Sequence, residues 1–304
     1  MRMLIKAVHP AVRNYLSCML FNVGNKLPRI AILRKAKLLF IAGIILILGN
    51  SRSFAQSLWL ERGENGTVAF EIMKPNLDDP DNSTLLTSAV YLSVIYPVSN
   101  SIVLSGEIPF GFWNSDSISP YFDEREREST IGNIYLGLEI HKDEEPLYSD
   151  IGFRLPLTPN SDESGGNAGR AGRYADWVER KEAFIADYIP VIVGINYRQV
   201  IIKGLYIRVR VAPSVLISTH GEGQELGFLF TTQLGYKTEM FNFITGFSSG
   251  GTGGLYYSDS PGSQLGFATN LNFGRVSPVF FFKIPLEENY MLEWTLGFSL
   301  LYHL

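Results

Sequence analysis

The stretch from residue 292 to residue 304 alternates apolar side chains with polar or small ones. The apolar positions are Leu292, Trp294, Leu296, Phe298, Leu300, Tyr302 and Leu304. Because successive side chains of a β-strand point to opposite faces, this pattern predicts a strand with one unbroken apolar face. The sheet that contains such a strand must meet an apolar environment, which is either a protein core or membrane hydrocarbon.

Comparable runs fill the chain after Gln56, each bounded by Gly, Pro, Asn, Asp or Ser. The twelve predicted strands are residues 67–73, 85–96, 101–112, 131–141, 149–157, 184–198, 205–217, 225–237, 240–248, 264–273, 279–286 and 291–304. Residues 175–186 are the only helix candidate in this part of the sequence, and they are short and heavily charged. The pattern therefore predicts an all-β fold.

The distribution of charge distinguishes a soluble sheet from a membrane barrel. The more apolar faces carry one charge, Asp187. The opposite faces carry Glu71, Glu107, Glu139, Asp150, Arg154, Arg198, Arg208, Arg210, Glu225, Lys237, Lys283 and Glu293. The strands are also longer than the five or six residues typical of soluble sheets, which suits a tilted membrane crossing. We therefore predict a transmembrane antiparallel up-and-down β-barrel of about twelve strands, with the charges facing the lumen.

The connections support this prediction, because long polar ones alternate with short ones. The long ones cover residues 74–84, 113–130, 158–183, 218–224 and 249–263, whereas 287–290 is short and breaks the pattern. Outer-membrane barrels have long external loops and short periplasmic turns. The prolines Pro109, Pro156, Pro190, Pro213 and Pro285 count against the prediction. Proline cannot donate to a closed ladder, and a bulge near the rim accounts for all of them except Pro190 and Pro213.

The first 55 residues are predicted to be an export signal. Arg34, Lys35 and Lys37 precede an apolar run at 38–49, and Ser53-Phe54-Ala55 forms a small-x-small cleavage site. A run of 12 residues is short for a bilayer-spanning anchor, although an uncleaved anchor is the alternative. Residues 1–33 are an unusually long preface, which indicates a start site assigned too far upstream. We therefore divide the chain into a signal segment, 1–55, and an outer-membrane barrel, 56–304.

Net charge narrows the range of partners. Residues 1–55 hold nine of the 26 bases and no acid, so residues 56–304 carry 17 bases against all 30 acids. A surface this acidic repels nucleic acid. The expected partners are outer-membrane lipid and lipopolysaccharide, the barrel-assembly machinery and a small-molecule solute.

Two acidic and two glycine-rich segments lie between the predicted strands. Residues 78–81 and 123–128 are acidic external segments that would bind Ca²⁺ or bridge lipopolysaccharide phosphates, or are simply solvated. The glycine-rich stretches 165–169 and 250–254 are interpreted as flexible external loops. The second of them lacks the Lys-Ser/Thr and the helix of a phosphate-binding loop.

Residues 132–139 read Gly-Asn-Ile-Tyr-Leu-Gly-Leu-Glu. They resemble a Gly-Asp-Ile/Leu-x-Leu-Gly-Leu strand found in uncharacterised bacterial outer-membrane barrels related to the putative transporters of phenol meta-cleavage pathways. Asn133 stands where that strand has Asp, and the chain ends on Leu304 rather than an aromatic residue. The resemblance covers one strand of twelve and implies an outer-membrane, channel-like role.

The inward-facing charges are the candidate functional residues. The lumen and selectivity candidates are Glu107, Glu139, Arg154, Arg198, Arg208, Arg210 and Glu293. In a pore, opposed rows of charge select solutes by charge and size. We expect a narrow channel for a small, apolar or aromatic solute, with loops 113–130 and 158–183 as gate or plug.

Two alternatives stay open. One is a closed structural or docking barrel in which the charges satisfy one another. The other is a lipid-hydrolysing barrel, which needs a lipid-facing nucleophile beside a histidine. His141 is predicted to face inward, and neither His220 nor His303 has a spacing that suggests a metal site. We therefore expect no enzyme, no metal and no cofactor.

Overall fold

The computed structural model describes residues 66–77, 87–119, 122–140, 146–159, 166–221, 223–252, 262–287 and 292–304. The predicted signal segment 1–55, the acidic segment 78–81 and His141 lie outside these residues. Within the described ranges, no helix is long and apolar enough to cross a bilayer.

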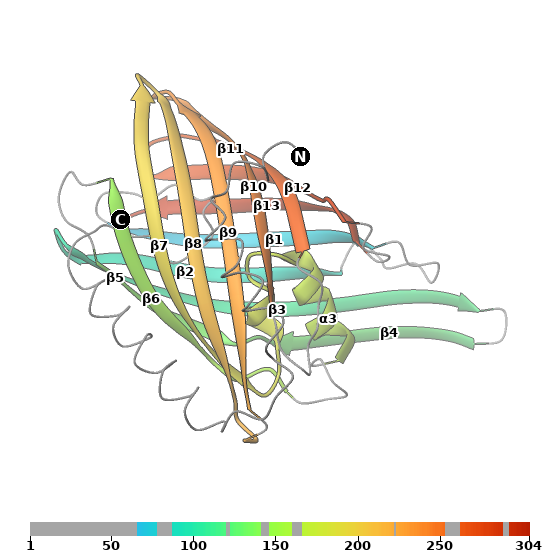
Figure 1. Cartoon of the computed structure of the whole chain (residues 1–304). Helices are drawn as coiled ribbons and strands as arrows, with labels where there is room; N and C mark the ends of the chain where they lie inside the picture. The colour runs from blue at the N-terminus through green and yellow to red at the C-terminus, as the bar shows by residue number, and fades with distance from the viewer. Residues whose placement is uncertain are drawn as a thin grey trace, which may run out of the picture. The chain divides into compact units, whose positions relative to one another are not determined.

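Thirteen strand segments form one antiparallel sheet that closes on itself (Figure 1). They are β1 (Thr67–Leu77), β2 (Ser88–Ser99), β3 (Ile102–Ser119), β4 (Phe122–Ile131), β5 (Ile134–Ile140), β6 (Leu147–Leu155), β7 (Tyr188–Ile202), β8 (Leu205–Ser218), β9 (Gln224–Lys237), β10 (Phe241–Thr252), β11 (Gly262–Leu271), β12 (Val276–Pro285) and β13 (Leu292–His303). Apart from β4 and β5, which both pair with β3, each strand pairs with its sequence neighbours, and β1 also pairs with β13. The predicted barrel is confirmed.

The strand count agrees with the prediction because β4 and β5 share one place in the wall. The C-terminal half of β3, from Phe110 on, pairs with β4, and its N-terminal half, up to Glu107, pairs with β5. The wall therefore has twelve strands. The expectation of a loop at 113–130 is wrong, because most of those residues belong to the β3–β4 hairpin, which extends beyond its neighbours (Figure 1).

Two of the prolines, Pro109 and Pro213, lie where the ladder is irregular. Opposite Pro109, the chain leaves β4 and enters β5 through Gly132 and Asn133, and the Gly132 amide donates to the Pro109 carbonyl at 2.8 Å. Near Pro213, the pairing of β7 with β8 skips from Ser214 to Val211. Proline has no backbone N–H to donate, and this lack costs little where the ladder is interrupted.

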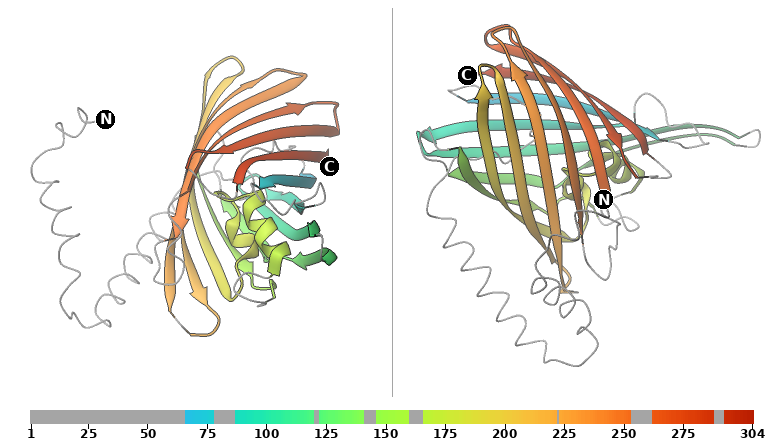
Figure 2. Two further views of the ribbon diagram at one scale, coloured as in Figure 1. Left: turned by 90° about the vertical axis from the view of Figure 1, so that its right-hand side faces the viewer. Right: turned by 45° about the horizontal axis from the view of Figure 1, so that its top comes forward.

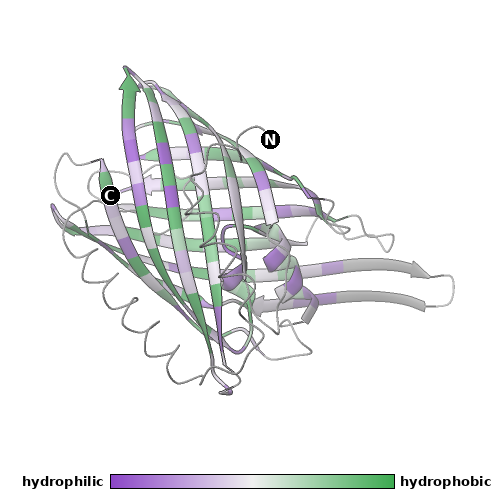
Figure 3. Ribbon diagram, viewed as in Figure 1, coloured by the Kyte–Doolittle hydropathy of each residue, from purple (hydrophilic) through white to green (hydrophobic). Residues whose placement is uncertain are grey.

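The outer face of the barrel is apolar. On β1, Val68, Phe70 and Ile72 are 43%, 40% and 37% exposed, whereas Glu71 between them is 1% exposed. Figure 3 shows this alternation of apolar and polar residues along the strands. A contiguous exposed apolar surface of this kind requires a lipid environment, so the polar faces surround the lumen.

The connection between β6 and β7 contains the helix α3 (Gly166–Ala175) and the short 3-10 helix η2 (Lys181–Phe184). Helix α3 contacts β1, β2, β3 and β4 (Figure 2). Its residues Ala168, Ala171 and Ala175 are fully buried. The expected flexible loop at 165–169 is therefore wrong over Gly166–Gly169, which form the first turn of this helix.

Candidate functional site

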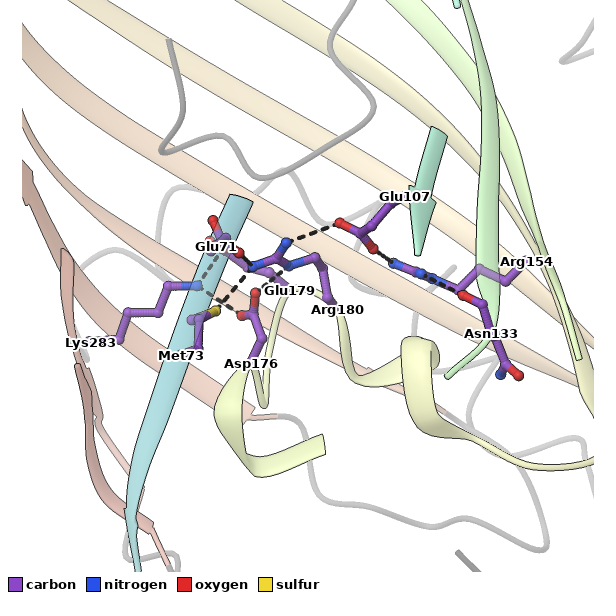
Figure 4. Close-up of polar contacts among 9 residues, drawn as sticks. All are labelled: Glu71, Met73, Glu107, Asn133, Arg154, Asp176, Glu179, Arg180 and Lys283. Atoms are coloured by element: carbon purple, nitrogen blue, oxygen red, sulfur yellow. Dashed lines mark hydrogen bonds and ion pairs between the residues drawn. The ribbon is translucent and has the colours of Figure 1, made fainter. Parts of the chain in front are cut away.

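Residues 166–187, which we call the plug, reach the lumenal faces of strands that are distant from one another in the wall. Arg180 is the centre of these contacts (Figure 4). Its guanidinium binds Glu71 of β1, Glu107 Oε2 of β3 at 3.0 Å and Asp176 Oδ2 at 2.6 Å. The guanidinium carbon also lies 3.8 Å from the ring centroid of Tyr91 on β2, a cation–π contact. One buried side chain thus binds three wall strands.

Lys283 of β12 holds the other side of the same turn. Its Nζ lies 2.8 Å from Asp176 Oδ1 and 2.9 Å from Glu179 Oε2. Ser248 of β10 donates to Glu179 Oε1 at 2.5 Å. Burial alone would raise the pKa of the Asp176 carboxyl, but the Lys283 ammonium and Arg180 guanidinium lower it below its usual value.

Asn133 fastens both ends of the β6–β7 connection. Its Nδ2 donates to the carbonyls of Glu182 and Ile185 at 3.1 and 2.6 Å. Its Oδ1 accepts from the amides of Leu157 and Thr158 at 2.9 and 3.0 Å. Two donated and two accepted hydrogen bonds are the full capacity of a side-chain amide. The irregular backbone opposite Pro109 therefore positions this side chain as an anchor of the plug.

Glycine allows the plug backbone to approach the wall closely. A Cβ at Gly111 of β3 would overlap the Ala168 carbonyl, and one at Gly132 would overlap the Ala183 carbonyl. Phe184 packs edge-on against Tyr91, with ring centroids 6.3 Å apart. Apolar burial thus supplements the ionic contacts.

Glu128 of β4 caps helix α3. Its Oε2 accepts from the amides of Asn167 and Ala168 at 2.8 and 3.3 Å. These amides are among the first of the helix, which have no partner inside it, and a carboxylate there also meets the positive end of the helix dipole. The acidic segment expected at 123–128 therefore contributes Glu128 to the plug contacts.

A second network lies nearer the turns that connect β5 to β6 and β7 to β8. Arg210 Nη1 and Nη2 lie 2.7 and 2.9 Å from the two carboxylate oxygens of Asp150. Asn196 donates to Asp150 Oδ2 at 2.7 Å. Closer to the β7–β8 turn, Arg198 and Arg208 are directly opposite each other, and both lie about 5 Å from the ring centroid of Tyr206.

The structure places most predicted candidates on the buried lumenal face. Glu107, Glu139, Arg154, Arg208 and Arg210 are each at most 6% exposed, and Arg198 is half-buried. Arg154 donates to Glu107 Oε1 at 2.9 Å, so Glu107 bridges Arg154 and Arg180. Glu293 does not join this group. It is exposed at the end of β13, where it accepts from Asn76 at 2.5 Å beside a register shift in the β1–β13 ladder.

Sequence reasoning missed the charges supplied by the plug itself. Asp176, Glu179 and Arg180 lie outside every strand, so the alternation of faces gave no information about them. The sequence feature that could have revealed them is the charged stretch 175–186. Within it, Asp176 and Arg180 have the four-residue spacing of a helical ion pair.

Two histidines are placed by the structure. His220 Nε2 lies 3.0 Å from Asp187 Oδ1 at the end of the plug. His303 contacts the Thr67 and Ser277 hydroxyls at 3.2 and 3.1 Å. Across the part of the chain that the structure describes, no group of three or more His, Cys, Asp or Glu residues could hold a metal ion.

No protein-family model matches the chain, and no curated protein matches it in sequence. A solved outer membrane channel from Pseudomonas putida F1 aligns with a TM-score of 0.56 at 9% identity, over 82% of this chain and 99% of that one. The translocator domain of the autotransporter NalP from Neisseria meningitidis gives 0.49 at 10% identity, over 89% and 98%. The NanC porin gives 0.48 at 10% identity, over 79% and 100%.

The likeness to the Pseudomonas channel establishes the fold, which is that of a bacterial outer-membrane β-barrel. It confirms the outer-membrane part of the resemblance seen at residues 132–139. No sequence match tests the relation to phenol meta-pathway transporters.

Proposed function

We propose that this protein is a gated outer-membrane channel for a small solute, and that the plug is its gate. The observation that carries the proposal is the way the lumen is filled. A twelve-stranded barrel is wider than the eight-stranded barrels that wall side chains fill. Here an inserted segment occupies the interior, and charged pairs hold it there.

The chemistry of these contacts supports a reversible closure. Buried ion pairs are costly to desolvate, and well-packed apolar residues of similar volume often stabilise a fold more. Arg180, Lys283 and their partners are therefore a poor choice for a permanent filler. Such pairs have the advantage that they can be exchanged for water and solute when the segment moves.

The expected gating element is the plug, since the other candidate segment, 113–130, belongs to the β3–β4 hairpin of the barrel wall. In the closed state the candidate charges other than Arg198 and Glu293 are buried. Release of Arg180 would free Glu71 and Glu107 to line a polar passage that selects solutes by charge and size. Contacts with lipopolysaccharide outside the barrel and insertion by the barrel-assembly machinery are part of the same proposal, as is the absence of enzymatic activity.

Single-channel recording in planar bilayers tests the proposal. We expect rare openings for the unaltered protein and frequent openings for Arg180→Ala. Arg170 is the matched control, because it also belongs to the plug but lies on helix α3 with its side chain exposed. Arg170→Ala should behave like the unaltered protein.

If neither the unaltered protein nor Arg180→Ala conducts, the closed structural barrel is the correct interpretation. Phospholipid hydrolysis by the purified, folded barrel would contradict the non-enzymatic part of the proposal.

A further inference from the structure

One lumenal strand differs from those that bind the plug. Along β9, Glu225, Thr231 and Gln233 point to the buried face and are at most 4% exposed. Both carboxylate oxygens of Glu225, the Thr231 hydroxyl and both polar atoms of the Gln233 amide have no hydrogen-bond partner among the described residues. Buried polar groups normally find a partner, so three such residues on one strand need an explanation.

The neighbouring strand positions extend this polar row sideways. Thr231 is opposite Ser248 of β10, which in turn is opposite Gln264 of β11. The Gln264 Nε2 is also buried without a partner among the described residues. Gln233 is opposite Gly246, and its side chain occupies the space that a Cβ at Gly246 would take. Thr231, Gln233, Ser248 and Gln264 therefore form one polar patch, and Glu225 lies on the same face about 20 Å farther along β9.

The plug borders this patch without pairing its orphaned groups. Helix α3 contacts β1 to β4, and the ionic contacts of the Asp176–Arg180 turn reach β1, β3 and β12. The same turn touches β10 through the bond from Ser248 to Glu179 and β11 through Trp177 beside Gly262, but it supplies no partner to Glu225, Thr231, Gln233 or Gln264 Nε2. We propose that the row Glu225, Thr231, Gln233 and Gln264 is the solute path of the open channel, and that it takes small, uncharged, hydroxyl-rich solutes such as pentoses and polyols. This inference rests on the proposed channel function.

The chemistry of the row selects that class. Amide and hydroxyl groups both donate and accept, as do the hydroxyls of a sugar, and the Glu225 carboxylate accepts from hydroxyls. Apolar or aromatic solutes would leave these buried donors and acceptors unpaired, which is unfavourable. The solute class expected from the sequence alone, apolar or aromatic, therefore does not suit this strand.

Charge at the two ends of the row disfavours ions of either sign. Glu225 lies at the β8–β9 loop end of the strand, and Gln233 is directly opposite Arg208. Glu225 and Gln233 are about 27 Å apart at roughly 3.4 Å per residue, so a small solute meets them in succession. The Glu225 carboxylate repels an anion and the Arg208 guanidinium repels a cation, whereas a neutral solute meets no like charge.

Proteoliposome swelling tests this path, with arabinose as the neutral probe and gluconate and choline as charged probes. The measurements use Arg180→Ala barrels, whose folding is checked by heat-modifiable gel mobility. We expect arabinose to enter roughly tenfold faster than either ion. Adding Thr231→Val and Gln233→Leu should slow arabinose entry roughly tenfold, the loss of one to two hydrogen bonds, and leave KCl conductance intact.

Thr232→Val is the matched control, because Thr232 is the next residue on β9 and lies on the opposite face. It should leave arabinose entry unchanged. The inference is overturned if Thr231→Val with Gln233→Leu has no effect, if Thr232→Val slows arabinose equally, or if an ion enters as fast as arabinose. In each of these cases a conducting Arg180→Ala barrel would leave the channel proposal standing. Loss of KCl conductance in Arg180→Ala itself would overturn both.

Discussion

The two sides of the lumen differ in how their buried charged and amide side chains are bound. On the side of β1, β3 and β12, Glu71, Glu107 and Lys283 each bind a charged partner on the plug. On β9, Glu225 and Gln233 are equally buried but have no partner among the described residues. The first side is built to hold the plug in place. The second keeps its hydrogen-bonding capacity for a molecule that is not part of the chain.

The largest contrast between the two sides should appear when the same substitution is made on each. Glu107→Gln removes the charge that Arg154 and Arg180 share. Breaking a buried pair leaves an uncompensated charge, so we expect a loss of about 3–5 kcal/mol of stability. Glu225→Gln removes a buried charge that has no such pair, and it should leave stability unchanged or raise it.

Urea titration of both variants, followed by heat-modifiable gel mobility, measures this difference. Equal losses in Glu107→Gln and Glu225→Gln would show that the two sides of the lumen are alike, and would remove the basis of the comparison.

Asn133 allows a finer test on the plug side. Asn133→Asp keeps the size of the side chain but removes the two donors to Glu182 and Ile185, and it places a charge against their carbonyl oxygens. We expect a loss of about 2–3 kcal/mol, because buried acceptors are left unpaired. Limited proteolysis should then cleave within 166–187 faster.

Asn272→Asp is the control for this substitution. Asn272 also donates to a backbone carbonyl, that of Glu239, but at an exposed turn. It should change neither the stability nor the cleavage rate. A plug that stays resistant in Asn133→Asp would show that this amide does not anchor it.

The barrel wall could be predicted from the sequence and the plug could not, for a physical reason. Strand faces follow a two-residue period, so Glu107, Arg154 and Arg210 were placed in the lumen without knowledge of the fold. Helix α3 begins Gly-Asn-Ala-Gly, a stretch with poor intrinsic helix propensity. Its helical state depends on burial against β3 and on the cap from Glu128, which are contacts between distant parts of the chain.

The same limit applies to irregularities in the wall. The bulge at Gly132 and Asn133 and the exposed position of Glu293 arise from register shifts, which alternation alone does not reveal. The resemblance at residues 132–139 did identify the region of Asn133. It gave no indication that this side chain holds the plug.

Acid should weaken the plug side more than β9. Asp176 has a lowered pKa because Lys283 and Arg180 stabilise its charged form. A lowered carboxyl pKa contributes stability above the unfolded value of about 3.9, and this stability is lost as the pH falls through the folded value. We therefore expect the channel to open more often below about pH 4. The effect should be smaller than that of Glu107→Gln, because a protonated Asp176 can still accept hydrogen bonds from Lys283 and Arg180.

Single-channel recording between pH 7 and pH 3 measures this response. In Asp176→Asn the contribution of this carboxyl is absent at every pH, so openings should be more frequent at pH 7 and less dependent on pH. An acid response of unaltered size in Asp176→Asn would assign it to another group.

The smallest expected effect concerns the cap of helix α3. Glu128→Gln keeps an acceptor for the amides of Asn167 and Ala168 but removes the charge that favours the helix N-terminus. We expect a loss of about 0.5–1 kcal/mol, seen as a modest rise in proteolysis near residue 166. Glu287→Gln is the control, because Glu287 also accepts from a backbone amide, that of Ser263, at an exposed site. If Glu128→Gln opens the channel as often as Arg180→Ala, then the helix start, rather than the Asp176–Arg180 turn, holds the plug closed.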